Sequence, residues 1–124
     1  MNIKEELIEK LINNTNAKKS TWRISRSDSF RDYLLDQNKI LRVFETEYNN
    51  RIILLVEKRY FPEEQYYNNE PNIFEEQIYE IYIIEKNILT VIIHQNEISA
   101  KICKELIDTV VVKFTDEYIK KMLE

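Results

Sequence analysis

The chain has 124 residues and a net charge of −4, with 44% hydrophobic and 32% charged residues. This balance is typical of a globular chain of single-domain size, so we expect residues 1–124 to form one domain. Glycine is absent. Its absence excludes glycine-rich phosphate loops and dinucleotide-binding turns, because both need backbone that only glycine supplies readily.

The expected location is the cytoplasm. No apolar run approaches the roughly 18 residues of a membrane span, and residues 1–6 lack the pattern of a secretory signal. Cys103 is the only cysteine, so no disulfide within the chain can form, as suits a reducing compartment. Asn, Ile, Lys and Glu are abundant, a usage associated with A+T-rich coding in bacteria and phages.

The N-terminal part predicts a helix, a short strand and a second helix. Residues 3–12 place apolar side chains at helical spacing. Residues 21–26 alternate, with Trp22 on the side predicted to be buried and Arg23 on the other. Ser27 or Asp28 suits the start of a short helix that reaches about residue 35.

The middle of the chain predicts two β-hairpins. Their strand-like runs cover residues 40–48, 51–61, 77–85 and 88–94. The predicted turns are Asn49-Asn50 and Lys86-Asn87, because asparagine tolerates the positive φ of tight hairpins. Residues 62–76 are predicted as the longest loop. The run 88–93 is apolar on both faces, which favours a central strand covered by helices.

The C-terminal part predicts helices. Apolar residues from Ile98 to Val111 form one stripe, with Asn96 or Ser99 as the expected cap. The branched residues 110–112 disfavour helix, so a strand at 109–114 is an alternative, and Thr115 or Asp116 would then begin a final helix. The resulting fold class is α+β, with an antiparallel sheet of about five strands packed by N- and C-terminal helices.

Charge is unevenly distributed along the chain. Residues 45–85 carry ten Glu against three Lys and Arg, and they hold six of the eight tyrosines. Tyrosine supplies rigid contact area, and surrounding carboxylates can steer a basic partner. We therefore predict a partner-binding surface, with ordinary solvated strand faces as the alternative. Its candidate residues are Glu45, Glu47, Glu57, Tyr60, Glu63, Glu64, Tyr66, Tyr67, Glu75 and Glu76.

The residues that could perform chemistry are few. His94 is the only histidine, and its place at the end of an apolar strand favours a structural role over that of a general base. His94 and Cys103 offer two N/S ligands, fewer than the four of structural zinc. Cys103 lies on an apolar stripe, which favours burial. We expect no metal, no cofactor and no catalytic residue.

A basic cluster around Trp22 is the candidate for nucleic-acid binding. It comprises Lys18, Lys19, Arg23, Arg26 and Arg31. Because the whole chain is acidic and Trp22 is predicted to be buried, direct binding to nucleic acid is not expected. Pairing of this cluster with the acidic half of the chain is the alternative.

The leading hypothesis is a non-catalytic protein-binding domain, an acidic inhibitor of a larger basic target such as a toxin or a defence nuclease. Immunity proteins and anti-CRISPR proteins share this general character. One alternative is a small hydrolase or nuclease that uses carboxylates and Mg²⁺, with the pairs Glu63-Glu64 and Glu75-Glu76 as its candidates. Another is a homo-oligomer formed through a sheet edge or the last helix.

Overall fold

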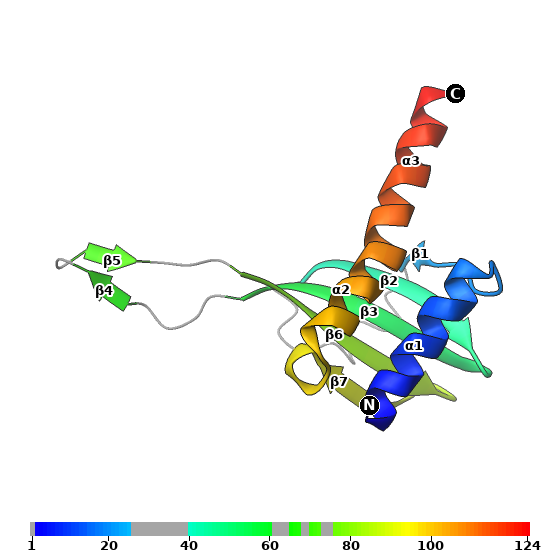
Figure 1. The fold of residues 1–124 in the computed structure, drawn as a ribbon, viewed down its shortest axis with the longest axis horizontal. Coiled ribbons are helices and arrows are strands. Elements are labelled where there is room, and N and C mark those ends of the chain that lie inside the picture. Colours follow the sequence, from blue (N-terminus) through cyan, green and yellow to red (C-terminus); the bar gives the residue numbers. More distant parts are fainter. Residues whose placement is uncertain (1, 26–39, 61–64, 68–69, 73–75) are drawn as a thin grey trace.

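The computed structural model of the chain describes residues 2–25, 40–60, 65–67, 70–72 and 76–124 (Figure 1). The helix predicted to start at Ser27 or Asp28 lies outside these residues. In chain order, the elements are α1 (Ile3–Asn16), β1 (Arg23–Ile24), β2 (Ile40–Tyr48), β3 (Arg51–Tyr60), β4 (Gln65–Tyr67), β5 (Glu70–Asn72), β6 (Glu76–Glu85), β7 (Ile88–His94), the 3₁₀ turn η3 (Gln95–Glu97), α2 (Ala100–Ile107), the π-helical segment η4 (Asp108–Val112) and α3 (Lys113–Leu123).

The described strands form a five-stranded antiparallel sheet in the order β1-β2-β3-β6-β7. Figure 1 shows α1 and α2 lying across one face of this sheet. The predicted α+β class, its two hairpins, its short N-terminal strand and its terminal helices are therefore confirmed. No helix among the described residues is long and apolar enough to cross a membrane.

Both hairpin turns use residues in the left-handed region. The φ angles are 50° and 62° at Asn49 and Asn50, and 50° and 65° at Lys86 and Asn87. A two-residue turn with positive φ at both positions matches the right-handed twist of the strands that it joins. Asparagine takes three of these four positions, as predicted, and Lys86 takes the fourth.

The prediction that residues 88–93 form a central strand is wrong, because β7 is the last strand in the order of the described strands. Ile88 is 65% exposed and Val91 is 38% exposed. The apolar run alone could not distinguish a strand buried on both faces from an edge strand that leaves some of its apolar residues at the surface.

Helix α1 begins with a capping box. The Asn2 side chain accepts a hydrogen bond of 2.9 Å from the Glu5 N–H, and the Glu5 carboxylate accepts one of 3.2 Å from the Asn2 N–H. Such a cap contributes about 1 kcal/mol of helix stability. The helix ends four residues later than predicted, at Asn16. Its buried residues Ile8, Leu11 and Ile12 face the sheet.

The C-terminal residues form one continuous helical rod from Ala100 to Leu123, capped by Ser99. The strand considered at 109–114 and the new helix start at Thr115 or Asp116 are both wrong. The branched residues are accommodated by the π-helical turn of η4 instead, whose extra residue per turn lets the consecutive side chains 109–111 be buried together. Tertiary packing thus overrides the weak helix propensity of valine.

A hydrophobic core fills the space between the sheet and the helices. It joins Leu11 of α1, Phe44 of β2, Leu55 of β3, Ile81 of β6 and Leu106 of α2, each at most 4% exposed. Trp22, 9% exposed, belongs to the same core, and its Nε1 donates to the Thr15 hydroxyl at 2.9 Å. Burying each large side chain contributes about 1.5–3 kcal/mol.

The opposite face of the sheet is also buried in its centre. Leu54, Val56, Tyr82 and Ile84 are at most 1% exposed and form a second apolar cluster. Alternation along β3 and β6 sends neighbouring residues to opposite faces, so each strand contributes to both clusters. The consecutive buried residues 53–56 and 81–84 reflect this burial on both sides.

The predicted loop at residues 62–76 contains a second, smaller sheet. Strands β4 and β5 pair antiparallel, with Gln65 opposite Asn72 and Tyr67 opposite Glu70. In Figure 1 they lie well apart from the five-stranded sheet, beyond the ends of β3 and β6. Three-residue strands with a proline among them carry too weak a pattern to be identified from the sequence.

Candidate functional site

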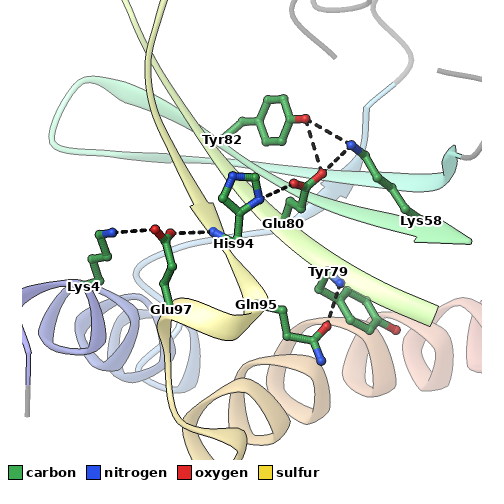
Figure 2. A network of polar contacts seen from close by, with 8 residues as sticks. All are labelled: Lys4, Lys58, Tyr79, Glu80, Tyr82, His94, Gln95 and Glu97. Atoms are coloured by element: carbon green, nitrogen blue, oxygen red, sulfur yellow. Dashed lines mark hydrogen bonds and ion pairs between the residues drawn. The ribbon is translucent and has the colours of Figure 1, made fainter. Parts of the chain in front are cut away.

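A group of ionisable and hydroxyl side chains gathers on the sheet face that lies opposite the helices. Lys58 of β3, Glu80 and Tyr82 of β6, and His94 of β7 make up this group, which we call the Lys58 network (Figure 2). The strand register brings them together, because Glu80 lies opposite both Val56 of β3 and His94 of β7. Lys58 follows Val56 by two residues and therefore projects from the same face.

Glu80 is the centre of the network. One carboxylate oxygen forms an ion pair with Lys58 Nζ, and the other lies 2.6 Å from Nδ1 of His94. The Tyr82 hydroxyl accepts a hydrogen bond of 3.3 Å from Lys58 Nζ and donates one of 3.5 Å to Glu80. Lys58 and Glu80 are only 4% and 6% exposed, whereas the His94 side chain is 51% exposed. The network thus runs from the interior to the surface.

Lys58 retains its charge in this position. Burial acts to lower its pKa, but the hydrogen bonds to Glu80 and Tyr82 and the charge of Glu80 act in the opposite direction, and the net result is a raised pKa. A buried ammonium group is tolerated when an anion and hydrogen-bond acceptors surround it. The pair is therefore a salt bridge at neutral pH.

A hollow of about 890 Å³ adjoins the exposed end of the network. It lies between the first half of β6 and the η3 turn. Its lining includes Tyr79, Glu80, His94, Gln95 and Glu97. Glu97 fixes the turn by accepting a hydrogen bond of 2.8 Å from the His94 N–H and by pairing with Lys4 at 2.9 Å. Gln95 accepts a hydrogen bond of 2.9 Å from the Tyr79 N–H.

The geometry suits orientation of His94 rather than covalent chemistry. A carboxylate at Nδ1 fixes the imidazole ring and leaves Nε2 for an external partner. The hollow contains no serine, threonine, cysteine or lysine among its described lining residues. Cys103 is 5% exposed, and burial raises the pKa of its thiol, which disfavours the reactive thiolate. Among the described residues, no three His, Cys, Asp or Glu side chains are grouped to hold a metal ion.

Two of the predicted partner-binding carboxylates are used inside the fold. Glu45 is 5% exposed, forms an ion pair with Arg23 and accepts a hydrogen bond of 3.0 Å from Ser25. Glu57 is 4% exposed and accepts two hydrogen bonds from Arg42, at 3.0 and 3.3 Å. These contacts neutralise both carboxylates within the sheet. Arg23 belongs to the basic cluster, so its ion pair with Glu45 agrees with the alternative in which that cluster pairs with the acidic half of the chain.

Tyr79 extends the Glu57 contact toward the helices. Its hydroxyl donates to Glu57 at 2.9 Å, and its ring packs against the helix-side core. Burial, followed by the hydrogen bond to Glu57, raises the Tyr79 pKa well above its usual range. The phenol therefore stays protonated and acts as a hydrogen-bond donor.

The remaining predicted site residues lie elsewhere. Glu47 is exposed near the end of the β2–β3 hairpin. Tyr60 and Glu76 form the last residue pair between β3 and β6, and Tyr66 and Tyr67 belong to β4. Glu63, Glu64 and Glu75 lie outside the described residues. The predicted set therefore does not form one described surface: Glu45 and Glu57 are paired inside the fold, Glu47 is exposed on β2, and the other residues fall within residues 60–76 of the sequence.

Sequence reasoning missed the Lys58 network apart from His94. A signal for it was present, because Lys58 continues the alternation of Leu54 and Val56, and Glu80 continues that of Tyr82 and Ile84. Charged residues at inward-facing positions of two strands indicate a buried pair if the strands are neighbours. The pairing of β3 with β6, which residues 61–75 separate in the sequence, could not be predicted from the sequence pattern.

Comparison of the chain with models of protein families, with curated protein sequences and with solved structures finds no match.

Proposed function

We propose that this chain is a protein-binding module that neutralises a larger basic partner, as the immunity and anti-CRISPR classes do. The observation that carries the proposal is the composition of residues 60–76, which we call the acidic span. These residues include five Glu and five aromatic residues, and they contain no Lys or Arg. The span includes β4 and β5, which form a sheet separate from the five-stranded sheet.

The internal ion pairs strengthen the case for the acidic span. Glu45, Glu57 and Glu80 are neutralised by Arg23, Arg42 and Lys58, so they add little to the external field. Within the acidic span, five Glu occur without a Lys or Arg in the same stretch of sequence. Such a charge raises the association rate with a basic partner, and tyrosines supply contact area once the two proteins touch.

The proposed mechanism is occlusion of a basic surface. A nuclease must hold phosphates in a cleft lined by Lys and Arg, and the acidic span can enter that cleft in place of nucleic acid. This mechanism needs shape and charge but no catalytic residue. The partner is therefore expected to be a toxin or a defence nuclease that binds nucleic acid.

Charge reversal tests the proposal. Glu63, Glu64, Glu75 and Glu76 are replaced together by lysine in the full chain. The control replaces Glu6, Glu9, Glu105 and Asp108 on the helices by lysine, so both variants gain the same net charge. Each immobilised protein is exposed to a lysate of the native host, retained proteins are identified by mass spectrometry, and the protein retained by wild type is purified for kinetic measurement.

The expected result is an association rate constant at least about tenfold lower for the acidic-span variant than for the control variant. Both variants should keep the far-ultraviolet circular dichroism spectrum of the wild type. Equal association rates for the two variants would contradict the proposal. So would the absence of any protein retained by wild type in preference to the acidic-span variant.

A further inference from the structure

The C-terminal helix α3 carries an apolar face that the rest of the described molecule leaves uncovered. The helical rod packs on the sheet through α2 and η4, where Leu106, Val110 and Val111 are 2–8% exposed. Exposure then rises along α3, to 48% at Ile119 and 81% at Leu123. Figure 1 shows α3 projecting away from the sheet and from α1. The apolar stripe of the rod thus continues past the surface that it covers.

The exposed apolar residues of α3 lie on one side of the helix. Ile119 and Met122, three residues apart, share a face with the half-buried Thr115, which precedes Ile119 by four residues. Tyr118 and Leu123 border this face, and Tyr118, Met122 and Leu123 are 57–81% exposed. An apolar face of this kind on a short helix in water indicates a packing partner.

The base of α3 is fixed in place, so this face is presented by a supported helix. Phe114 contacts Phe44 of the core edge-on, with ring centroids 5.5 Å apart, and Tyr118 stacks on Phe114 at 6.3 Å. Thr115 donates a hydrogen bond of 2.9 Å to the Val111 carbonyl across the junction with η4.

The charges beside the apolar face complement those of a second, reversed copy of the same helix. Asp116 lies one turn before Lys120 on the same flank. Neither side chain has an ion pair within the part of the chain that the structure describes. If two such helices pack antiparallel with Tyr118 near the two-fold axis, Asp116 of each copy lies beside Lys120 of the other. Same-flank pairing of this kind is what an antiparallel two-helix contact requires.

We propose that α3 is a self-association surface and that its occupant is α3 of a second copy, packed antiparallel about an axis near Tyr118. The proposal is independent of the partner proposed for the acidic span. A helix of 11 residues is about 16 Å long, so the contact is smaller than a standard interface of about 800 Å² per subunit. The dimer is therefore expected to dissociate in the micromolar range.

Sedimentation velocity at protein concentrations from about 1 µM to about 1 mM tests self-association. We expect a monomer–dimer equilibrium in the wild type and a monomer throughout for Ile119→Asp. Lys104→Asp, an exposed substitution on α2, serves as the matched control and should leave the equilibrium unchanged. A wild type that stays monomeric over the whole range would overturn the proposal, as would a dimer that Ile119→Asp leaves intact.

Charge swaps test the antiparallel register. Asp116→Lys and Lys120→Asp each place like charges across the interface, so each variant alone should show a dissociation constant raised about tenfold. Mixing the two variants restores opposite charges at both positions, and a heterodimer should form with an affinity near that of the wild type. No recovery on mixing would overturn the antiparallel arrangement.

Cysteine cross-linking locates the axis. Tyr118→Cys should form a disulfide-linked dimer under mild oxidation, because residue 118 faces its own counterpart near the axis. Leu123→Cys should remain uncrosslinked, since antiparallel helices place the two copies of residue 123 about 15 Å apart along the axis. The native Cys103 is present in both variants, and because it is buried it should not form cross-links itself. Rapid cross-linking at residue 123, or none at 118, would overturn the proposal.

Discussion

Glu80 and His94 lie opposite each other across the β6–β7 pair, with a carboxylate oxygen 2.6 Å from the histidine Nδ1. The same carboxylate holds Lys58 on the other side. One glutamate therefore links a buried cation of a central strand to an imidazole on the edge strand. Because Glu80 holds both groups, it is the member of the network whose removal has the largest consequence.

Glu80→Leu should destabilise the protein by about 3–5 kcal/mol, because it leaves the Lys58 ammonium buried without its anion. Lys58→Met should cost less, since Glu80 keeps His94 and Tyr82 as partners. Urea unfolding followed by circular dichroism measures both free energies.

The matched double variant Lys58→Met/Glu80→Leu distinguishes a coupled pair from two independent contacts. An apolar pair in place of a buried salt bridge is often neutral, so the double variant should be more stable than Glu80→Leu alone. A double variant that loses the sum of the two single costs would show that the two side chains are not energetically coupled.

Acid pH should weaken the contact between the start of α1 and the start of α2. Hydrogen bonds from the backbone N–H groups of Asn2 and Ser99 lower the pKa of Glu5. A lowered pKa in the folded state gives a stabilising contribution that is complete above about pH 4.3 and is lost as the pH falls through the folded pKa.

Glu5→Gln should remove this contribution, so its unfolding free energy should fall less than that of the wild type between about pH 6 and pH 3. Glu6→Gln is the control, because Glu6 is exposed and its carboxylate makes no hydrogen bond in the described part of the chain. Identical pH profiles for Glu5→Gln and the wild type would contradict the assignment.

Cys103 should react with thiol reagents only through unfolding. The side chain is 5% exposed, and burial raises the pKa of the thiol, so little thiolate is present at neutral pH. Labelling with dithionitrobenzoate should be slow in the native protein and rapid in urea. Rapid labelling of the native protein at a rate independent of urea would contradict the burial of this side chain.

Asn50→Ala should destabilise the β2–β3 hairpin by about 1–2 kcal/mol, because alanine is disfavoured at the φ of 62° found at this position. Asn50→Gly should be neutral or slightly stabilising, since glycine adopts this conformation freely. Thermal unfolding of the two variants measures the difference. Equal midpoints for Ala and Gly would show that the turn rearranges.

The hairpins were predictable because their information is local. Asn49-Asn50 sits between two strand-like runs, and turn chemistry alone joins them. The position of β7 at the edge was not predictable, since it depends on the pairing of β3 with β6, which are separated by residues 61–75. The same non-local pairing creates the Lys58 network, so its residues could be recognised only after the strand order was known.

The candidate surface was predictable in part for a related reason. Counting charge along the chain identified the acidic half, but it could not separate exposed from buried carboxylates. Glu45 and Glu57 resembled surface residues in the sequence. Each forms an ion pair with an arginine of the neighbouring strand, Arg23 of β1 for Glu45 and Arg42 of β2 for Glu57. The acidic span lacks such internal compensation in its own sequence, and it remains the basis of the proposed function.

The most direct test of that function is the ionic-strength dependence of association with the protein retained from the host. Biolayer interferometry between about 20 mM and about 500 mM NaCl should show the wild-type association rate constant falling at least about tenfold. The acidic-span variant, in which Glu63, Glu64, Glu75 and Glu76 are lysine, should lose this dependence on salt. The control variant with lysines on the helices should keep it. A wild-type rate constant that does not change with salt would contradict an account based on the charge of the acidic span.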